Sequence, residues 1–311
     1  MDMHAAVLHA AGETPRYEPF PAPVAGDGET VVTVTAAALK PSDRLMAAGV
    51  HYAPTEFPVV VGLDGVGRLP DGTRVCFLIP QRPYGGMAAQ TLVRDGMWLP
   101  VPDGVDDVTA AAFANPGMAA WKTIVWEGEL AAGQTALILG ATGASGRIAT
   151  QLAIRRGARV VVAGRNQSAL DRLTELGAAA TIRVDRPRDE IAADIAAAGP
   201  YDLIADYLWG APAEAVFAGL GQTTPVRYIL VGMTAGEVAG LPAVALRRSP
   251  VTLLGSGTGG PASLSDAAAA YAGLLGQVAA GELSLDIDAV PLAEVAKHWH
   301  SGGDRRVVFV P

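Results

Sequence analysis

The chain has 311 residues, of which 50% are hydrophobic and 17% are charged, and its formal net charge at pH 7 is −8. These values favour a folded chain with room for two domains and exclude a disordered one. Lysine and arginine form no block, which argues against nucleic acid as a partner. No basic signal segment opens the sequence and no stretch approaches 18 uninterrupted apolar residues, so we expect a cytoplasmic protein with no membrane partner.

The first 115 residues have the texture of a β-rich region. Thr30 to Thr35 alternates between valine and threonine, and many prolines and glycines separate short apolar runs such as Pro58 to Val61. Between Gly62 and Gly67, glycines recur at every second or third residue, as they do in a strand that another backbone approaches closely. The single cysteine, Cys76, lies in an apolar run, where we expect a buried structural thiol.

Helical texture begins near Asp106 and leads to a glycine-rich turn. An apolar run of strand length, Ala136 to Leu139, is followed by glycines at three-residue spacing, a helical pattern, and a second apolar run at Val160 to Ala163. This strand, turn, helix and strand predict a nucleotide-binding unit in which amides at the start of the helix face a phosphate. A tight loop without a ligand is the alternative. The candidate cofactor-binding residues of the turn are Gly140, Ala141, Thr142, Gly143, Ala144, Ser145 and Gly146.

The end of the second strand predicts which coenzyme binds. It reads Gly164, Arg165, Asn166, with no carboxylate to bind the ribose hydroxyls of NAD or to repel a 2′-phosphate. Arg165 can offer that phosphate a charge-assisted contact, so we predict NADP(H). In the alternative interpretation, Arg165 is a solvated loop cation and Asn166 only caps the next helix.

Strands and helices alternate through the rest of this region, which favours a parallel sheet wound on both faces. A long alanine-rich helix and a terminal strand follow and are expected to rejoin the first domain. The expected helices are Ser168 to Leu176, Asp189 to Ala198, Pro212 to Gly219 and Leu264 to Ala280, and the expected strands are Thr181 to Val184, Leu203 to Tyr207, Tyr228 to Val231, Val251 to Gly255 and Val307 to Val310.

The order of these segments resembles the medium-chain dehydrogenase/reductase superfamily, and within it the zinc-free NADPH:quinone oxidoreductase branch. The resemblance covers nearly the whole chain. It depends on several short motifs in the expected order: Lys40-Pro41-Ser42-Asp43, Pro58 to Gly67, Gly85-Gly86-Met87-Ala88, Pro102-Asp103-Gly104-Val105, the glycine turn, Leu176-Gly177-Ala178 and Arg306-Val307-Val308.

The resemblance implies an α/β fold with two domains. A GroES-like, β-rich catalytic domain would comprise residues 1–116 and 262–311, and a Rossmann domain with a doubly wound, six-stranded parallel sheet would comprise residues 117–261. It also implies a homodimer built by pairing the strand Val251 to Gly255 with its copy, which would cover a sheet edge.

Two departures from the superfamily's alcohol dehydrogenases indicate that no metal is bound. Those enzymes hold zinc through a cysteine near the position of Lys40 and through a Gly-His-Glu motif where this chain has Gly62-Leu63-Asp64, and leucine cannot ligate a metal. His298 and His300 lie two apart on a predicted helix and chelate poorly. Without a Lewis acid, hydride transfer from NADPH to an electron-poor quinone or α,β-unsaturated carbonyl is the easier chemistry.

Few side chains are candidates for binding or protonating the reduced acceptor. Tyr52 falls where the family often has a tyrosine at the cleft, and a phenol can donate a hydrogen bond or a proton; an ordinary aromatic wall is the alternative. Lys40 replaces the family asparagine and either binds the developing oxyanion or pairs with Asp43. His51 is a weaker candidate for relaying a proton.

Further cofactor contacts follow from position in the family pattern, although a turn or packing role explains each of them equally well. Ligands of open α/β folds bind at the carboxyl edge of the sheet, where two of these segments are expected. The candidates are Asn115, Val231, Gly232, Met233, Ser256, Gly257 and Arg306.

A second function remains open. The family asparagine is absent at Lys40, and a commonly acidic position is occupied by Ala89. A redox sensor or crystallin-like protein that binds NADPH with little or no turnover is therefore the alternative to an enzyme.

Overall fold

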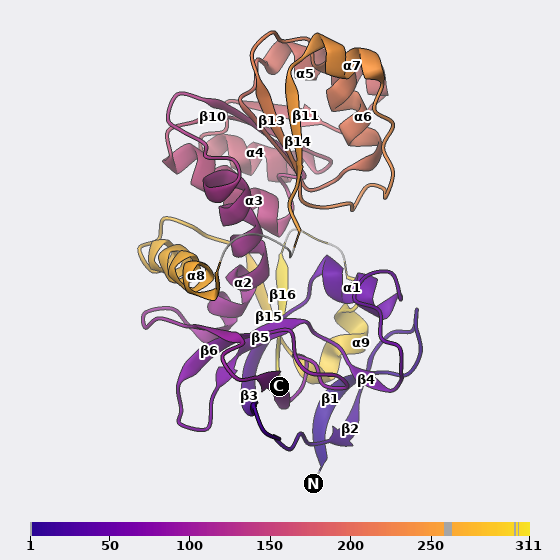
Figure 1. Ribbon diagram of the computed structural model, residues 1–311, viewed down its shortest axis with the longest axis vertical. Coiled ribbons are helices and arrows are strands. Elements are labelled where there is room, and N and C mark those ends of the chain that lie inside the picture. Colours follow the sequence, from indigo (N-terminus) through magenta and orange to yellow (C-terminus); the bar gives the residue numbers. More distant parts are fainter. Residues whose placement is uncertain (1, 258–262, 302, 304) are drawn as a thin grey trace. The chain divides into compact units, whose positions relative to one another are not determined.

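The computed structural model describes residues 2–257, 263–301, 303 and 305–311, and the chain divides into two compact units. The first unit comprises Met1–Asn115 and Ala262–Pro311, and the second comprises Pro116–Pro261. Both are drawn in Figure 1, where each can be followed by its labels. The helix α2 (Asp107–Trp121) begins in the first unit and ends in the second.

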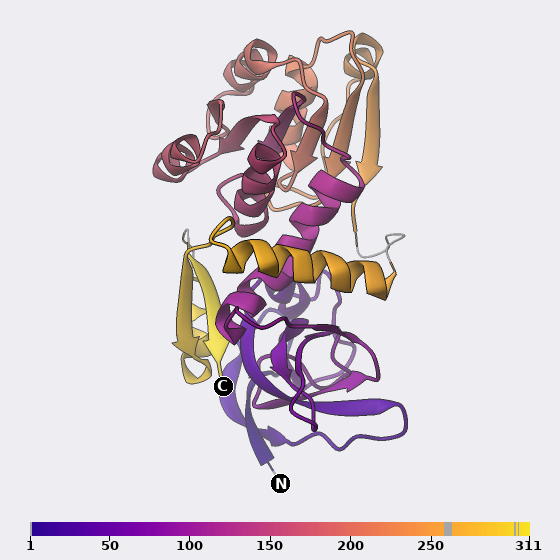
Figure 2. The ribbon, with the colours of Figure 1, turned by 90° about the vertical axis from the view of Figure 1, so that its left-hand side faces the viewer.

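The second unit is built on a parallel sheet of six strands, counted over the described residues, in the order β11-β10-β9-β12-β13-β14. Most residues of its central strands are buried, because helices cover both faces of such a sheet (Figure 2). The expected α/β class with a doubly wound parallel sheet is thus confirmed. The strands are β9 (Thr135–Leu139), β10 (Arg159–Gly164), β11 (Ala180–Arg183), β12 (Leu203–Asp206), β13 (Val226–Leu230) and β14 (Val251–Gly255).

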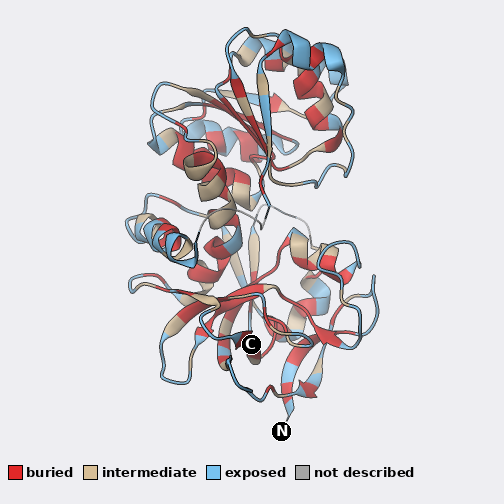
Figure 3. Cartoon of the chain, in the orientation of Figure 1, coloured by how far each residue is buried: buried red, intermediate tan, exposed pale blue. Residues whose placement is uncertain are grey.

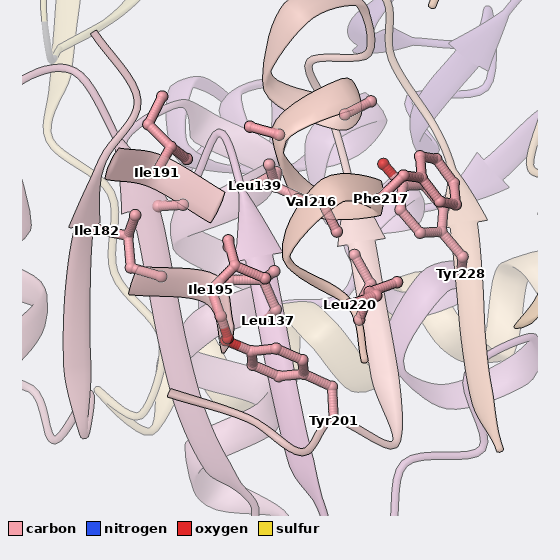
Figure 4. Packing of buried hydrophobic residues seen from close by; sticks show 14 of the residues in the cluster. Leu137, Leu139, Ile182, Ile191, Ile195, Tyr201, Val216, Phe217, Leu220 and Tyr228 are labelled. Carbon is pink, nitrogen blue, oxygen red and sulfur yellow. The ribbon is translucent and has the colours of Figure 1, made fainter. Parts of the chain in front are cut away.

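Helices pack on opposite faces of this sheet. On one face, the side chains of α5 and α6 join Leu137, Leu139 and Ile182 in a single apolar cluster (Figure 4). On the other face, α3 packs on β9 and β10, and α4 packs on β10 and β11. The helices are α3 (Ala144–Arg155), α4 (Gln167–Glu175), α5 (Arg188–Ala198), α6 (Gly210–Gly219) and α7 (Ala243–Arg248), with a π-helical segment η1 (Lys122–Trp126) after α2.

The strand order places the glycine turn at a special point of the sheet. Strand β9 pairs with β10 on one side and with β12 on the other, so the chain winds outward in both directions from β9. In open α/β folds, ligands bind at the carboxyl ends of the strands where the winding reverses. The turn after Leu139 lies at this reversal.

The first unit is β-rich, as expected. Its larger sheet has the order β15-β16-β3-β5-β6-β8, with β7 also paired to β3, and a smaller sheet has the order β2-β1-β4. The terminal strand β16 pairs with β3 and so returns to the region where the chain began. The strands are β1 (Asp2–Leu8), β2 (Arg16–Pro21), β3 (Glu29–Ala38), β4 (Val59–Val60), β5 (Asp64–Arg68), β6 (Arg74–Leu78), β7 (Gln90–Arg94), β8 (Trp98–Pro100), β15 (Ile287–Pro291) and β16 (Arg306–Val310).

The close backbone approach predicted between Gly62 and Gly67 is present. A Cβ on Gly65 would lie 2.8 Å from the backbone oxygen of Ala36, and a Cβ on Gly67 would lie closer still to the backbone oxygen of Thr33. The thiol of Cys76 is fully buried, and that burial raises its pKa far above the ordinary value. The cysteine therefore packs as a small apolar side chain, as predicted.

Several short elements were not anticipated, because they are too short for a periodic pattern. They include α1 (Pro41–Ala47), α7, β8 and β15. The helix expected over 292–299 is divided between a 3₁₀ turn, η2 (Leu292–Glu294), and the short helix α9 (Val295–His298). The alanine-rich helix α8 (Leu264–Ala279) follows the prediction and begins with a capping box at Ser263 and Asp266.

Burial follows the layers of each unit, with buried strands inside and exposed outer helix faces (Figure 3). Among the described residues, no helix combines the length and apolar character that crossing a bilayer requires.

Candidate functional site

The glycine turn is fixed by backbone contacts to its neighbouring strand. The N–H groups of Gly140 and Ala141 both donate to the carbonyl oxygen of Ala163, at 2.9 and 3.0 Å. Gly140 has a φ of +79°, in the left-handed region that glycine adopts without strain. The chain can therefore leave β9, reverse, and enter α3 within a few residues.

The third glycine brings α3 against this turn. A Cβ on Gly146 would lie 2.6 Å from Cα of Ala141, and closer still to the carbonyl oxygen of Gly140. A side chain at position 146 would thus push the helix away from the turn. Glycine keeps the first turn of α3 and the end of β9 in contact, as the close helix-to-strand packing of a dinucleotide-binding turn requires.

The N-terminus of α3 differs from that of the next helix, α4. The N-cap of α3 is Gly143, and no side chain caps it. At α4, the side chain of Asn166 accepts a hydrogen bond from the N–H of Ala169 at 3.2 Å. The first amides of α3 therefore lack a side-chain acceptor at the positive end of the helix dipole, an arrangement that suits a phosphate.

The end of β10 lies beside this turn. A Cβ on Gly164 would come within 2.7 Å of Cγ2 of Thr142, so only glycine fits there. Arg165 and Asn166 follow and are exposed. Asn166 caps α4, as the alternative interpretation anticipates, while the guanidinium of Arg165 is accessible to a ligand. The residues of the turn and of this strand end thus form one surface, which fits the phosphates of a dinucleotide.

In the first unit, Lys40 is the centre of a buried cluster of charges. Its side chain is 2% exposed, and its Nζ lies 2.7 Å from Oδ1 of Asp64 and 3.3 Å from Oδ2 of Asp43. The carbonyl oxygen of Ala38 accepts a further hydrogen bond from Nζ at 3.3 Å. We call Lys40, Asp43 and Asp64 the charged cluster.

Asp43 also organises the backbone around the charged cluster. Its Oδ2 accepts the N–H of Lys40 at 2.9 Å, and its Oδ1 accepts the N–H of Leu63 at 3.1 Å. The carboxylate therefore ties the start of α1 to the segment that leads into β5. Because it accepts two amides as well as the ammonium, the charged form of this buried group is well satisfied.

Within the charged cluster, burial and neighbouring charges shift the pKa values in opposite directions. Burial lowers the pKa of Lys40, but the carboxylates of Asp43 and Asp64 outweigh that effect and hold its pKa above the ordinary value. Burial raises the pKa of Asp43, although Lys40 and the two backbone amides oppose the rise. The lysine is therefore an ammonium at neutral pH, and its charge is directed at the carboxylates.

Arg306, at the start of β16, has its charge near the same carboxylates. Its Nε and Nη2 are buried and have no hydrogen-bond partner in the described part of the chain. Burial lowers the pKa of Arg306, and the charges of Asp64 and Asp43 partly offset that effect. Its buried donors suit an acceptor oxygen from a ligand.

No family model matches the chain, but curated proteins and solved structures do. The probable NADPH-dependent quinone reductase tdiC of Emericella nidulans is 26% identical over an alignment that covers 99% of this chain and 100% of that protein. The quinone oxidoreductase of Thermus thermophilus, solved alone and in complex with NADPH, is 26% identical with a TM-score of 0.80, covering 99% of this chain and 100% of that one. These relatives and structural neighbours are proteins of the medium-chain dehydrogenase/reductase superfamily, so the resemblance predicted from the sequence is confirmed.

The fold of this superfamily is shared with more distant structures as well. A putative NADPH:quinone reductase from Bacillus thuringiensis superposes with a TM-score of 0.85 at 19% identity, covering 100% of this chain and 99% of that one. At that identity only the fold is common.

The positions at which the superfamily's alcohol dehydrogenases hold zinc here carry the charged cluster. Lys40 and Leu63 stand where the resemblance implies a cysteine and a histidine, and Asp64 stands where it implies a glutamate. Among the described residues, no group of three or more histidine, cysteine, aspartate or glutamate side chains could hold a metal ion. The cation that faces Asp64 is the ammonium of Lys40, at 2.7 Å.

Tyr52 lies in the loop that follows α1. Its φ is +52° and its side chain is 39% exposed. The rings of Tyr52 and His51 lie 4.2 Å apart between centroids, and the carbonyl oxygen of Tyr52 accepts a hydrogen bond from Arg82 at 3.1 Å. The phenol is therefore accessible, whereas the ammonium of Lys40 is not.

The predicted residues at the far end of the parallel sheet lie at its carboxyl edge. The N–H groups of Val231 and Gly232 both donate to the carbonyl oxygen of Asp206, at 2.8 and 3.1 Å, and Met233 follows them. The N–H of Ser256 donates to the carbonyl oxygen of Leu230 at 2.7 Å, which holds this residue at the end of β13. These backbone contacts give Val231 and Gly232 a turn role in addition to the predicted ligand role.

The other two predicted contacts lie on separate elements of the chain. Gly257 accepts a hydrogen bond from Nζ of Lys122 at 2.6 Å, so this residue is tied to the π-helical segment η1. Asn115 is exposed on α2.

Sequence reasoning missed Asp206, at the end of β12. Its carboxylate is fully buried and accepts hydrogen bonds from the N–H groups of Leu208 and Trp209, at 2.8 and 3.0 Å, and from the hydroxyl of Tyr228 at 2.6 Å. Burial raises the pKa of Asp206, although these donors oppose the rise. An aspartate that ends an apolar strand was the available signal, since a short polar side chain there often organises the following turn.

Proposed function

We propose that this chain is an oxidoreductase that uses NADPH to reduce a quinone or an α,β-unsaturated carbonyl. The observation that carries the proposal is the uncapped N-terminus of α3 behind Gly140 to Gly146, beside a strand end that bears Arg165 and no carboxylate. The names of its relatives, an NADPH-dependent quinone reductase and a quinone oxidoreductase solved with NADPH, support the same cofactor and substrate class.

The glycine turn and the end of β10 would each bind a different part of the coenzyme. The first amides of α3 would bind the pyrophosphate, and Arg165 would bind the 2′-phosphate. When bound, NADPH supplies the hydride. The further contacts predicted to the coenzyme would come, in the second unit, from Val231, Gly232, Met233, Ser256 and Gly257 and, in the first unit, from Arg306 and from Asn115, which the family pattern places near the nicotinamide.

Tyr52 is the better candidate for a donor to the reduced acceptor. Its phenol is accessible and can donate a hydrogen bond or a proton to a developing oxyanion. The ammonium of Lys40 already faces two carboxylates, so we assign this residue a supporting role in the site. The test is the Tyr52→Phe variant. If its turnover of a model enone stays within a factor of about two of the wild-type value, Tyr52 takes no part in the reaction.

The proposal is tested by following the oxidation of NADPH, through its near-ultraviolet absorbance, with 1,2-naphthoquinone, 9,10-phenanthrenequinone and a panel of enones. We expect turnover with at least one of these electron-poor acceptors and none with simple alcohols or ketones. Tight NADPH binding without oxidation by any acceptor would reject the enzymatic function and leave the cofactor assignment standing.

The choice of coenzyme is tested by replacing Arg165 with Ala. Loss of a charge-assisted contact to the 2′-phosphate is expected to cost about 1.5–3 kcal/mol in NADPH binding and nothing in NADH binding. Dissociation constants for both coenzymes, measured by calorimetry, give this comparison directly. An unchanged preference for NADPH over NADH would show that Arg165 does not bind the 2′-phosphate.

One observation favours a second function, a protein that binds NADPH with little or no turnover. Lys40 replaces an asparagine that the family usually places near the nicotinamide, and here its charge is neutralised within the charged cluster. A redox sensor or crystallin-like protein needs the glycine turn but no proton donor. The acceptor panel separates this function from the enzymatic one.

We also propose a homodimer formed through β14, and domains with the boundaries 1–116 with 262–311, and 117–261. Strand β14 ends the sheet order, and Leu253 in its centre is 41% exposed, so an unpaired edge is offered to a second copy. Light scattering after size exclusion should give twice the mass of 31.8 kDa. A monomer at micromolar concentration would reject the dimer.

A further inference from the structure

The basic end of β10 has a neighbour in space that is distant in sequence. Parallel pairing aligns Gly164 of β10 with Arg183 of β11, and the N–H of Val184 donates to the carbonyl oxygen of Gly164 at 3.0 Å. Neighbouring strands lie about 4.8 Å apart, so Arg183 stands beside the segment that leads into Arg165. A single phosphate group is within reach of both side chains at this separation.

The face of the sheet from which Arg183 projects follows from its neighbours. Paired residues on adjacent strands point to the same face, and the side chain that Gly164 lacks would meet Thr142 at 2.7 Å and Leu170 of α4 at 3.5 Å. Ile182 points the other way and packs with Ile191 and Ile195 of α5 (Figure 4). Arg183 therefore leaves β11 on the face that carries the glycine turn and α4.

The guanidinium of Arg183 is held by one carboxylate and remains accessible. Its Nε donates to Oδ1 of Asp185 at 2.8 Å, and its Nη2 donates to Oδ2 of the same residue. The side chains of Arg183 and Asp185 are 36% and 38% exposed. The fork uses Nε and one hydrogen of Nη2, which leaves the two hydrogens of Nη1 for another acceptor.

We propose that Arg183 is a second cation for the 2′-phosphate of NADPH, and that Asp185 sets the strength of this contact by competing for the same guanidinium. The inference rests on the proposed function, in which the end of β10 accepts that phosphate. Two arginines on adjacent strand ends can bind different oxygens of one phosphate group by charge-assisted hydrogen bonds. Asp185 neutralises part of this charge while the site is empty and repels the phosphate when it binds.

The competing explanation is that Arg183 and Asp185 form an ordinary surface ion pair. Such pairs contribute little to stability, so folding measurements do not distinguish the two explanations. Binding measurements with two probes that differ only in the 2′-phosphate do distinguish them. Calorimetry on the full chain with 2′,5′-ADP and with 5′-AMP isolates that group from the rest of the coenzyme.

The Arg183→Ala variant is expected to bind 2′,5′-ADP about tenfold more weakly than the wild-type chain and to bind 5′-AMP within a factor of about two. Retained 5′-AMP binding also demonstrates that the variant is folded. The matched control is Arg227→Ala, because Arg227 has the same side-chain exposure of 36%, pairs with Glu129, and lies near the start of β13, toward the opposite edge of the sheet. This control should leave the affinity for both probes unchanged.

The role of Asp185 gives a change in the opposite direction. Asp185→Asn should raise the affinity for 2′,5′-ADP by about threefold, since the competing charge is removed, and should not alter 5′-AMP binding. In the double variant with Arg183→Ala this gain in affinity should shrink or vanish, because the guanidinium that Asp185 competes for is absent. An equal gain in both backgrounds would mean that Asp185 acts by general repulsion, and would overturn the proposed competition.

The outcomes separate this inference from the function on which it rests. If the wild-type chain binds 2′,5′-ADP no better than 5′-AMP, the NADP(H) assignment itself fails. If it does prefer 2′,5′-ADP, and Arg165→Ala removes the preference while Arg183→Ala does not, only the assignment of Arg183 is overturned. A loss of 2′,5′-ADP affinity in both variants, with the Arg227→Ala control unchanged, supports two arginines that bind one phosphate.

Discussion

The glycine turn and the charged cluster hold polar groups in opposite ways. The turn is made of consecutive residues, and the first amides of α3 behind it have no side-chain cap. The cluster joins Lys40 to Asp64, 24 residues further on, and its ammonium and carboxylates are paired inside the unit. The turn is therefore open to a ligand. The charges of the cluster are already paired with one another, so the cluster primarily holds the fold together.

The largest effect is expected from breaking the cluster. Lys40→Met leaves two carboxylates in a buried site without their cation, and should lower the free energy of unfolding by about 3–5 kcal/mol at pH 8. The matched control is Lys297→Met, because Lys297 pairs with Glu294 at 2.9 Å on the surface, where its side chain is 73% exposed. Urea denaturation should give a loss for the control of at most about 1 kcal/mol. Equal losses of unfolding free energy in the two variants would refute the distinction between the buried cluster and a surface ion pair.

The pH dependence of stability should sharpen the same difference. Because the folded chain holds the pKa of Lys40 above 10.5, the stabilisation from its charge is complete below that pH and is lost as the pH rises through the folded value. The gap in unfolding free energy between the wild-type chain and Lys40→Met should therefore stay constant between about pH 8 and about pH 10 and narrow only as the pH rises through the raised folded pKa of Lys40. Urea titrations at each pH measure the gap, and a gap that widens with pH would contradict this sign.

In the glycine turn, the backbone itself is the sensitive part. Gly146→Ala would place a Cβ 2.6 Å from Cα of Ala141, so α3 must shift away from the turn. We expect a loss of about 1–3 kcal/mol in unfolding free energy, together with a fall in NADPH affinity. Gly221→Ala is the control, since nothing lies within 4 Å of its added Cβ. Thermal denaturation with and without NADPH would detect both effects, and an unaltered NADPH-induced shift would argue against the turn as the binding site.

The smallest effect on stability, with a clear effect on binding, is expected at Gly143. Its backbone is extended (φ −81°, ψ 168°), so a side chain is tolerated, and Gly143→Asp supplies the cap that α3 lacks. The unfolding free energy should change by no more than about 0.5 kcal/mol. NADPH affinity should fall by about tenfold or more, because the new carboxylate occupies and repels the phosphate position. Gly143→Asn, which caps without charge, should lose less affinity in calorimetry.

Much of the second unit could be predicted from the sequence. The strand Val251–Gly255 has the predicted bounds, and the helices α4, α5 and α6 begin and end within two residues of those expected. These elements are encoded locally, by apolar runs and by glycines and caps at their ends. The short helix α1 and the strand β15 were not predicted, because each is short and has a partner elsewhere in the unit: the carboxylate of Asp43 in α1 accepts the N–H of Leu63, and β15 pairs with β16.

By itself, the sequence determined the strand, turn and helix around Gly140 to Gly146, since each glycine there answers a requirement of its immediate neighbours. Only the tertiary structure decided that Asp64 faces Lys40 and that Arg183 stands beside the end of β10. Strand pairing and register bring these charges together, and neither is encoded in the residues next to them. The physical reason is that a turn is stabilised by contacts a few residues apart, whereas the partner of a buried or paired charge is set by how distant strands align.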